Sequence, residues 1–168
     1  MNLSNYGIDA LKRVEGCVMR DGRHVIYDDK TGQPVPAGGA LAGGATIGYG
    51  HLIKPGENFR DSITEAVATE LLRADVSCAE HAVRANIFCD LSQNQFDALV
   101  ILAFNIGAKN FANSTVVKYI NNPSFHSAQY PTLESAWLAW SKTGGRVNAG
   151  LIRRRNIELE IYKNAKYC

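Results

Sequence analysis

An acidic residue on an apolar helix face is the first sign of chemistry in this sequence. Glu15 follows Ile8 and Leu11 at the spacing of one helix face, in a helix that Ser4 can cap and Gly16 can end. The helix dipole puts negative partial charge at that end, and partial burial also disfavours an ionised carboxylate. Both effects would keep a proton on Glu15, as a general acid requires at neutral pH. A surface glutamate at a fraying helix end has the same pattern, so spacing alone leaves both interpretations open.

A second carboxylate and a hydroxyl follow along the chain. Asp28 and Asp29 come directly after the strand-like residues 24–27, and Thr46 lies in the strand-like segment 45–50. Each has an ordinary structural interpretation, since aspartate forms turns and threonine is common in strands. Together, an acid, a second carboxylate and a hydroxyl around one small sheet supply the groups for hydrolysis of a glycosidic bond.

The elements that must position these groups begin with a helix over residues 4–15. Residues 24–50 contain two strand-like segments joined by turn residues and predict a small antiparallel sheet. Ser62 and Glu65 form a capping-box pattern at the start of one long helix predicted over residues 62–86.

The rest of the chain is predominantly helical, so the fold class is α+β. Residues 92–107 are apolar on almost every side and predict a central buried helix. Shorter helical patterns follow around residues 114–121, 132–141 and 151–163. We expect one domain over residues 1–168, made of a sheet lobe (about 16–61), a linking helix (about 62–86) and a helical lobe (about 87–168, with helix 4–15).

Glycines are concentrated around Thr46. Residues 38–50 hold six of them: Gly38, Gly39, Gly43, Gly44, Gly48 and Gly50. We predict that the two glycines of TIGYG let a polymer approach the strand backbone closely, as a sugar chain bonding to main-chain groups would require. The four earlier glycines serve a longer loop or a flexible hairpin tip.

Composition excludes several classes of protein. No apolar run has the length of a membrane helix, and the polar N-terminus is not a secretory signal. The four cysteines form no C-x-x-C pair and no zinc-spaced cluster with histidine, so we expect free thiols, no metal and no cofactor. Residues 142–168 carry seven Lys and Arg against two Asp and Glu, which is typical either of a solvated basic helix or of a surface for an anionic polymer.

Three further patterns have structural interpretations. Trp137 and Trp140, three residues apart, favour core packing over sugar stacking. In the arginine run 153–155 we expect some side chains to face solvent and one to approach the acid site. His51 ends the second strand, and we expect Asp75 to fold back as its ion-pair partner and to raise its pKa.

Several ordered motifs give the chain a resemblance to a known family. RVEG, IYDD, TIGYGHL, SQNQFDALVILAFNIG and WSKTGGRVNAGLIRRR occur in the order found in the phage-type lysozymes, glycoside hydrolase family 24, and the match runs almost end to end. The resemblance implies a lysozyme-like fold and cleavage of the β-1,4 bond between N-acetylmuramic acid and N-acetylglucosamine in peptidoglycan. It also implies a catalytic Glu, Asp and Thr in that chain order.

Carried over by motif, the catalytic residues are Glu15, Asp29 and Thr46. Asp29 is chosen over Asp28 because the family's aspartate lies two residues beyond the tyrosine, here Tyr27. The chain departs from the family pattern in the longer segment between Asp29 and Thr46. The resemblance also implies substrate-binding residues, namely Leu52, Phe104 and Ser114.

The expected function is that of a phage endolysin, a muramidase that lyses the host. The resemblance implies a monomer that accumulates in the host cytoplasm and reaches the wall through a separate holin-type lesion, with no nucleic-acid partner and no membrane insertion. It also favours inversion at the anomeric carbon. Two alternatives are a lytic transglycosylase, which usually needs only the acid, and a wall-binding module, against which the presence of Glu15 argues.

Overall fold

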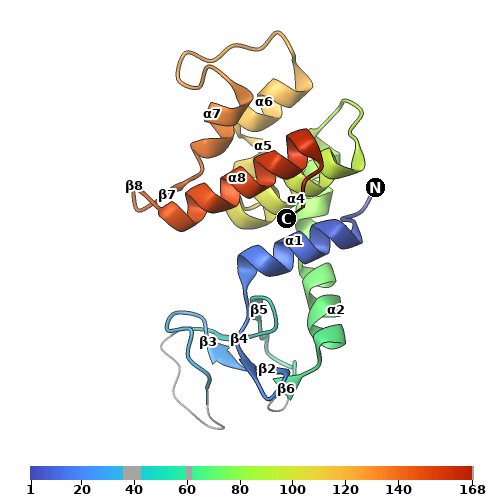
Figure 1. The fold of residues 1–168 in the computed structure, drawn as a ribbon, viewed down its shortest axis with the longest axis vertical. Coiled ribbons are helices and arrows are strands. Elements are labelled where there is room, and N and C mark those ends of the chain that lie inside the picture. Colours follow the sequence, from blue (N-terminus) through green and yellow to red (C-terminus); the bar gives the residue numbers. More distant parts are fainter. Residues whose placement is uncertain (36–42, 60–61, 168) are drawn as a thin grey trace. The chain divides into compact units, whose positions relative to one another are not determined.

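The computed structural model divides the chain into two compact units. Residues 11–75 form a sheet-containing unit, and residues 1–10 with 76–168 form a helical unit. Helix α1 (Asn5–Glu15) contributes residues to both. The structure describes residues 1–35, 43–59 and 62–167 (Figure 1).

Helix α1 begins and ends as the sequence predicts. The Ser4 hydroxyl accepts a hydrogen bond from the backbone N–H of Gly7, 3.0 Å away. Gly16 follows the last helical residue with φ +69°, a left-handed conformation that ends a helix at little cost for glycine. The apolar face is buried, with Ile8 and Leu11 at most 2% exposed.

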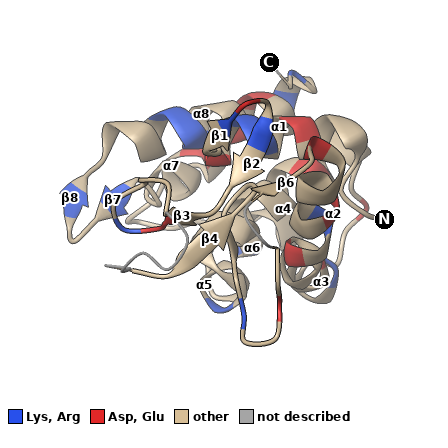
Figure 2. Cartoon of the chain, turned by 90° about the horizontal axis from the view of Figure 1, so that it is seen from below, with Lys and Arg blue, Asp and Glu red and all other residues tan. Residues whose placement is uncertain are grey.

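The sheet unit contains two three-stranded antiparallel sheets. Their strand orders are β1-β2-β6 and β3-β4-β5. Figure 2 labels all three strands of the first sheet. The first contains β1 (Met19–Arg20), β2 (Arg23–Val25) and β6 (Ser62–Ile63). The second contains β3 (Tyr27–Asp28), β4 (Ala45–Ile47) and β5 (His51–Leu52). The predicted single strand after His24 is therefore wrong, because the chain leaves one sheet and enters the other at Ile26.

The second predicted strand, over residues 45–50, is also shorter than expected. Strand β4 ends at Ile47, and the next three residues turn into β5. Gly48 and Gly50 adopt φ +66° and +93°, which side chains disfavour. A Cβ on Gly48 would lie 3.4 Å from the Cβ of Ala68, so the close approach here is by a helix of the protein itself. Approach of a sugar chain to this turn stays a prediction.

The predicted long helix over 62–86 is two helices, α2 (Glu65–Asp75) and α3 (Ser77–Asn86). Ser62 lies in β6 instead of capping a helix, and Thr64 accepts the bond from the N–H of Val67 at 3.4 Å. The break is at Val76, which keeps near-helical angles of φ −73° and ψ −12°. Because the backbone angles at Val76 are still close to helical, the apolar periodicity continues from α2 into α3. The sequence pattern therefore did not reveal the break between the two helices. The two units divide at this residue.

The helical unit is built around α4 (Gln93–Ile106), which begins with a capping box of Ser92 and Gln95. The prediction of a central buried helix is confirmed, since α4 packs against α3 and α8 (Figure 1). The remaining elements are α5 (Ala108–Ala112), α6 (Thr115–Asn121), α7 (Leu133–Leu138), β7 (Lys142–Thr143), β8 (Arg146–Val147) and α8 (Ala149–Asn164). Sequence analysis missed α5 and the β7–β8 hairpin. Among the described residues, the search found no helix with the length and apolar character needed to span a bilayer.

Candidate active site

Glu15 is the last residue of α1 and is half-buried. The helix is held one turn earlier, where the Lys12 ammonium lies 2.8 Å from Glu65 Oε1 of α2. Lys12 is at i−3 from Glu15, so this ion pair fixes the helix end that presents the candidate acid.

Asp28 and Asp29 have different surroundings although they are adjacent. Asp28 is 4% exposed, and its carboxylate accepts hydrogen bonds from the backbone N–H groups of Lys30, Thr31 and Gly43 at 2.9–3.0 Å. These bonds hold the turn after β3, which is the ordinary role of a turn aspartate. Asp29 is exposed, and its carboxylate accepts none of these three hydrogen bonds.

A single residue, Gly44, connects Asp29 with Thr46. The N–H of Gly44 donates to Asp29 Oδ1 at 2.7 Å, and its carbonyl accepts from the N–H of Asp29 at 3.1 Å. The same carbonyl accepts a long hydrogen bond, 3.5 Å, from the Thr46 hydroxyl. The carboxylate and the hydroxyl are therefore anchored to one main-chain group, despite the long segment between them.

Two glycines leave room for this arrangement. A Cβ on Gly43 would lie 1.9 Å from Asp29 Oδ1, and a Cβ on Gly44 would lie 2.4 Å from Cδ1 of Leu52. Neither glycine has a positive φ, so the requirement is space and not backbone freedom. Of the four earlier glycines, Gly43 and Gly44 thus have a role beside the site, whereas Gly38 and Gly39 lie outside the described residues.

Tyr27 is related to each of the three candidate catalytic residues, to Thr46 by strand pairing and to Glu15 and Asp29 by charge. It lies directly opposite Thr46 in the β3–β4 pair. Burial raises the pKa of its phenol, and the charges of Cys17, Glu15 and Asp29 raise it further, whereas a backbone hydrogen bond from Gly50 lowers it. Both carboxylates therefore act on one phenol. Sequence analysis used Tyr27 only to locate Asp29.

The predicted substrate-binding residues divide between the units. Leu52 lies opposite Thr46 in the β4–β5 pair and is 53% exposed. Phe104 is half-buried on α4, and Ser114 caps α6 by accepting a bond from the N–H of Val117 at 3.2 Å. Within the described part of the chain, no group of three or more acidic, histidine or cysteine side chains could hold a metal ion.

Comparison with known proteins identifies the family to which this fold belongs. The family model for phage lysozyme matches residues 12–158. The chain belongs to the phage lysozyme family. It is 37% identical over 158 residues to the endolysin of Salmonella phage P22. The aligned region covers 92% of this chain and 94% of that protein.

Solved structures of phage lysozymes have the same fold as this chain. An endolysin from Escherichia coli O157:H7 phage FAHEc1 superposes with a TM-score of 0.77 at 31% identity, covering 100% of this chain and 97% of that one. A mutant of P22 lysozyme gives 0.74 at 33% identity, covering 96% and 98%. The protein is thus a phage lysozyme of α+β fold, a glycoside hydrolase that cleaves peptidoglycan as an endolysin muramidase.

In this lysozyme, Glu65 joins three elements of the sheet unit. Its carboxylate accepts bonds from Lys12 at 2.8 Å and from the Tyr49 hydroxyl at 2.9 Å, and it lies 2.7 Å from His24 Nε2. Burial alone would raise the pKa of Glu65, but the hydrogen bonds from these three side chains lower it to about 2. The sequence pattern assigned Glu65 to a capping box and missed this role.

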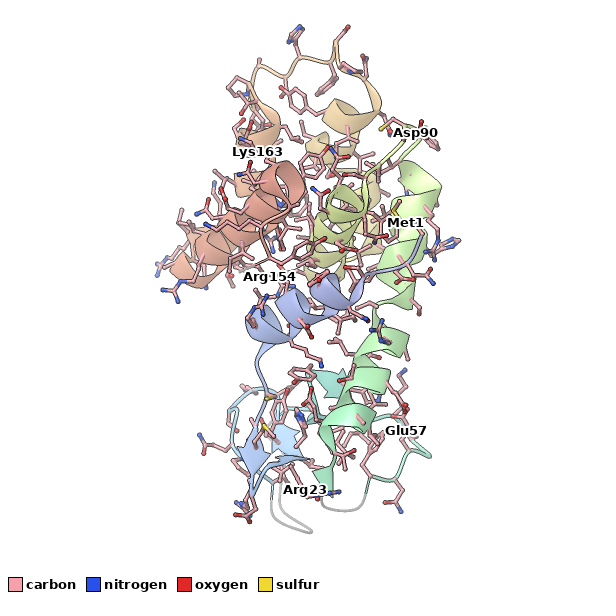
Figure 3. All side chains as sticks on the ribbon, turned by 45° about the vertical axis from the view of Figure 1, so that its right-hand side comes forward. Met1, Arg23, Glu57, Asp90, Arg154 and Lys163 are labelled. Atoms are coloured by element: carbon pink, nitrogen blue, oxygen red, sulfur yellow. The ribbon has the colours of Figure 1, made fainter. Side chains whose placement is uncertain are left out.

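The predicted ion pair of His51 with Asp75 is confirmed. His51 Nδ1 lies 2.9 Å from Asp75 Oδ2, and its Nε2 lies 3.1 Å from Glu57, a partner that sequence analysis missed. Glu57 is labelled in Figure 3. Burial alone would lower the pKa of His51, but the hydrogen bonds and charges of Asp75 and Glu57 outweigh burial and raise it.

The arginine run of the lysozyme has a structural role that the sequence did not predict. Arg154 and Arg155 are buried and lie 3.3 and 2.9 Å from the buried carboxylate of Glu158, whereas Arg153 is exposed. Burial raises the pKa of Glu158, against the charges of the two arginines. The Trp137 indole N–H also donates to Glu158, at 2.8 Å, so Trp137 is a core residue as predicted.

Proposed function

We propose that Glu15, Asp29 and Thr46 are the catalytic residues of this muramidase. The observation that carries the proposal is the joint anchoring of Asp29 and Thr46 to Gly44. The effect of both Glu15 and Asp29 on the pKa of Tyr27 supports the inclusion of the acid.

Each residue then has one role in the reaction. Glu15 donates its proton to the glycosidic oxygen as the bond to the anomeric carbon breaks, which leaves positive charge on the sugar ring. Asp29 takes a proton from a water molecule that attacks the opposite face of the ring, giving inversion. The Thr46 hydroxyl hydrogen is directed to the Gly44 carbonyl, so its oxygen lone pairs are available to accept a hydrogen bond from that water.

The substrate contacts follow the same proposal. Leu52 supplies exposed apolar surface next to Thr46 in the sheet. Phe104 and Ser114 contact the glycan from the helical unit. The name endolysin, shared by the relatives, supports action on the wall of the infected host.

The route to the wall is also a proposal. The lysozyme acts as a monomer, accumulates in the host cytoplasm and reaches the wall through a separate holin-type lesion, with no nucleic-acid partner and no insertion of its own into the membrane. Expression in the host with and without a holin tests the route. Lysis is expected only when the holin is present, and lysis without it would contradict holin dependence.

The catalytic assignment is tested with purified peptidoglycan. Glu15→Gln keeps the side-chain shape but has no proton to donate, so the rate should fall by about 10²–10⁴-fold with an unchanged or higher melting temperature. Glu70→Gln, an exposed carboxylate on α2, is the matched control and should keep full activity. A folded Glu15→Gln variant that clears walls at the wild-type rate would show that the acid is another residue.

Mass spectrometry of the released fragments tests the reaction class. Reducing muramic acid ends are expected from hydrolysis. Anhydro ends would instead identify a transglycosylase and would leave Asp29 and Thr46 without the proposed roles.

A further inference from the structure

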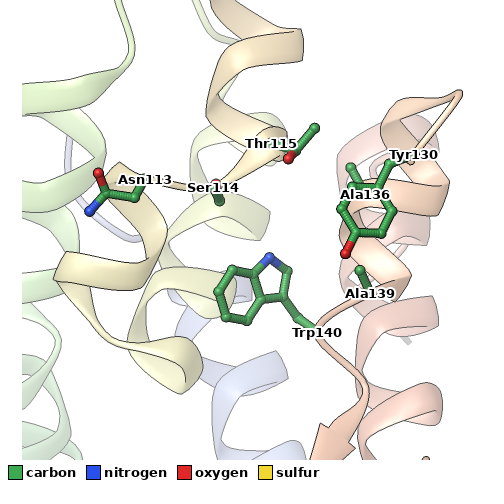
Figure 4. A pocket seen from close by; sticks show the side chains of 7 residues that line it. All are labelled: Asn113, Ser114, Thr115, Tyr130, Ala136, Ala139 and Trp140. Atoms are coloured by element: carbon green, nitrogen blue, oxygen red, sulfur yellow. The ribbon is translucent and has the colours of Figure 1, made fainter. Parts of the chain in front are cut away.

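The pocket at the start of α6 belongs to the substrate contacts proposed above. Its lining includes Ser114 and Trp140 (Figure 4). Trp140 is half-buried there, so the predicted core packing holds only for Trp137. A network of side chains in the sheet unit, in contrast, has no part in the proposed function, although it adjoins the helix that carries the candidate acid.

Glu65, at the start of α2, is the centre of this network. Its carboxylate accepts a hydrogen bond from the Lys12 ammonium at 2.8 Å, and the Tyr49 hydroxyl lies 2.9 Å from both of its oxygens. The third partner is His24, whose Nε2 lies 2.7 Å from Oε2. Both carboxylate oxygens are therefore occupied, by groups from α1, from β2 and from the turn between β4 and β5.

The three partners of Glu65 also hold one another in place. The Lys12 ammonium lies 5.5 Å from the centre of the Tyr49 ring, within the range of a cation–π contact, and the rings of His24 and Tyr49 meet edge to face with centroids 5.0 Å apart. His24 is fully buried, and in the described part of the chain its Nδ1 has no hydrogen-bond partner. Because a buried N–H without an acceptor is costly, Nε2 carries the proton and donates it to Glu65. An exposed ion pair alone would be weak, but a network with one member in the core has a defined geometry.

Lys12 transmits this geometry to the last turn of α1. Its carbonyl accepts the hydrogen bond from the N–H of Gly16 at 3.0 Å, so Lys12 closes the turn in which Glu15 lies. Its ammonium, bonded to Glu65, holds the same residue from outside the helix. The end of a helix otherwise tends to fray, because its last carbonyl groups have no partners within the helix. The pair of Lys12 with Glu65 therefore restrains the backbone from which the candidate acid projects.

Tyr49 connects the same network to the strand that carries Thr46. Thr46 lies in β4, and Tyr49 is in the turn that follows this strand. Glu65 is therefore bonded both to the helix that ends at Glu15 and to the turn beside the strand of the proposed catalytic hydroxyl.

We propose that Glu65 is a positioning residue for the hydrolysis. Through Lys12 and Tyr49 it joins the last turn of α1 to the β4–β5 turn, so that Glu15 keeps its place relative to Thr46. The inference rests on the proposed function, which takes Glu15 as the acid. A general acid must lie within hydrogen-bond reach of the atom that it protonates, and a displacement of about 1 Å can cost roughly 10²-fold in rate.

The test measures kcat and KM separately, on soluble glycan strands of uncross-linked peptidoglycan, at a temperature at which every variant is folded. Glu65→Gln removes the charge of the carboxylate, and Lys12→Met removes the ammonium but keeps a long unbranched side chain. Each should lower kcat by about 10- to 100-fold and leave KM almost unchanged, because no contact with the glycan is lost. Lys12→Arg keeps the cation and should retain most of kcat.

Glu70→Gln, an exposed carboxylate on the same helix, is the matched control and should keep both constants. A merely structural role of Glu65 would lower the melting temperature and leave kcat of the folded enzyme unchanged. Wild-type kcat in folded Glu65→Gln and Lys12→Met, or a loss confined to KM, would therefore overturn the proposal.

Combined variants show whether Lys12 and Glu65 act as a unit. The double variant Lys12→Met/Glu65→Gln should lose no more of kcat than the more impaired single variant, since either change breaks the same contact. Losses that multiply would mean that the two residues act independently, and would overturn the route through Lys12. Tyr49→Phe keeps the ring and removes one of the three donors, so it should lower kcat less than Lys12→Met does. A larger loss in Tyr49→Phe would overturn the same route.

The Glu15→Gln background separates this proposal from the catalytic one. Adding Glu65→Gln should leave the residual rate of Glu15→Gln unchanged, because an acid that is absent cannot be misplaced. A further loss of about 10- to 100-fold would mean that Glu65 acts elsewhere, so the positioning proposal would fail and the proposed function would stand. Wild-type activity of Glu15→Gln would instead remove the catalytic assignment and, with it, the acid that Glu65 positions.

Discussion

His51 Nδ1 in β5 lies 2.9 Å from Oδ2 of Asp75, the last residue of helix α2. His51 is 5% exposed, and Glu57 bonds its other ring nitrogen. The imidazole is therefore held between two carboxylates, and its pKa is raised above its ordinary value of 6.5 despite burial.

This relationship predicts a pH-dependent contribution to stability. Because the folded pKa of His51 exceeds the unfolded one, the stabilisation is fully present below the unfolded pKa and is lost as pH rises through the folded pKa. Asp75→Asn should lower the free energy of unfolding by about 1.5–3 kcal/mol at pH 5.5 and by less at pH 9. Denaturant unfolding at both pH values measures the difference, and an equal loss at both would contradict a charged pair.

Glu65 predicts the opposite pH dependence. Its pKa is lowered from 4.5 to about 2, so its stabilisation is present above the unfolded pKa and is lost as pH falls through the folded one. The side chain is 51% exposed, so Glu65→Gln should cost only about 1 kcal/mol at pH 7.

The melting temperatures of Glu65→Gln and wild type should converge as pH falls from 4.5 toward 2. The control is Glu70→Gln, on the same helix, which should melt like the wild type at every pH. A constant gap between Glu65→Gln and wild type over this range would mean that the charge of Glu65 is not the cause.

Substitutions of the two adjacent aspartates should have different effects, one mainly on stability and the other mainly on activity. Asp28→Asn weakens three backbone hydrogen bonds of a turn, so it should lower the melting temperature more than Asp29→Asn does. Asp29→Asn removes the proposed base and should lower wall hydrolysis by about 10²–10⁴-fold. Melting curves and hydrolysis rates of the two variants, measured side by side, decide the assignment, and the reverse pattern would transfer the role to Asp28.

Gly43→Ala should damage the site without straining the backbone. Its Cβ would lie 1.9 Å from Asp29 Oδ1, so the carboxylate must move. A displacement of about 1 Å can cost up to roughly 10²-fold in rate, and we expect a loss of that order with little change in melting temperature. Full activity in a folded Gly43→Ala variant would show that Asp29 is not held in its reactive position by this contact.

Local signals in the sequence predicted those features that depend on neighbours a few residues apart. Ser4 and Gly16 bound α1, and apolar periodicity located α4, because caps and helix faces are short-range properties. The ordered motifs placed the chain in its family, which supplied the choice of Asp29.

Only the tertiary structure decided where residues with similar sequence patterns take different positions in the fold. The helical pattern over 62–86 breaks at Val76 with hardly any change in its backbone angles, where the two units divide. Asp97 lies on the apolar helix α4, where its buried carboxylate binds the backbone N–H of Ser4 and the hydroxyl of Tyr167. Likewise, Trp137 is in the core whereas Trp140 lines a pocket. Such outcomes depend on contacts between residues distant in sequence, and local periodicity carries no information about which distant groups will meet.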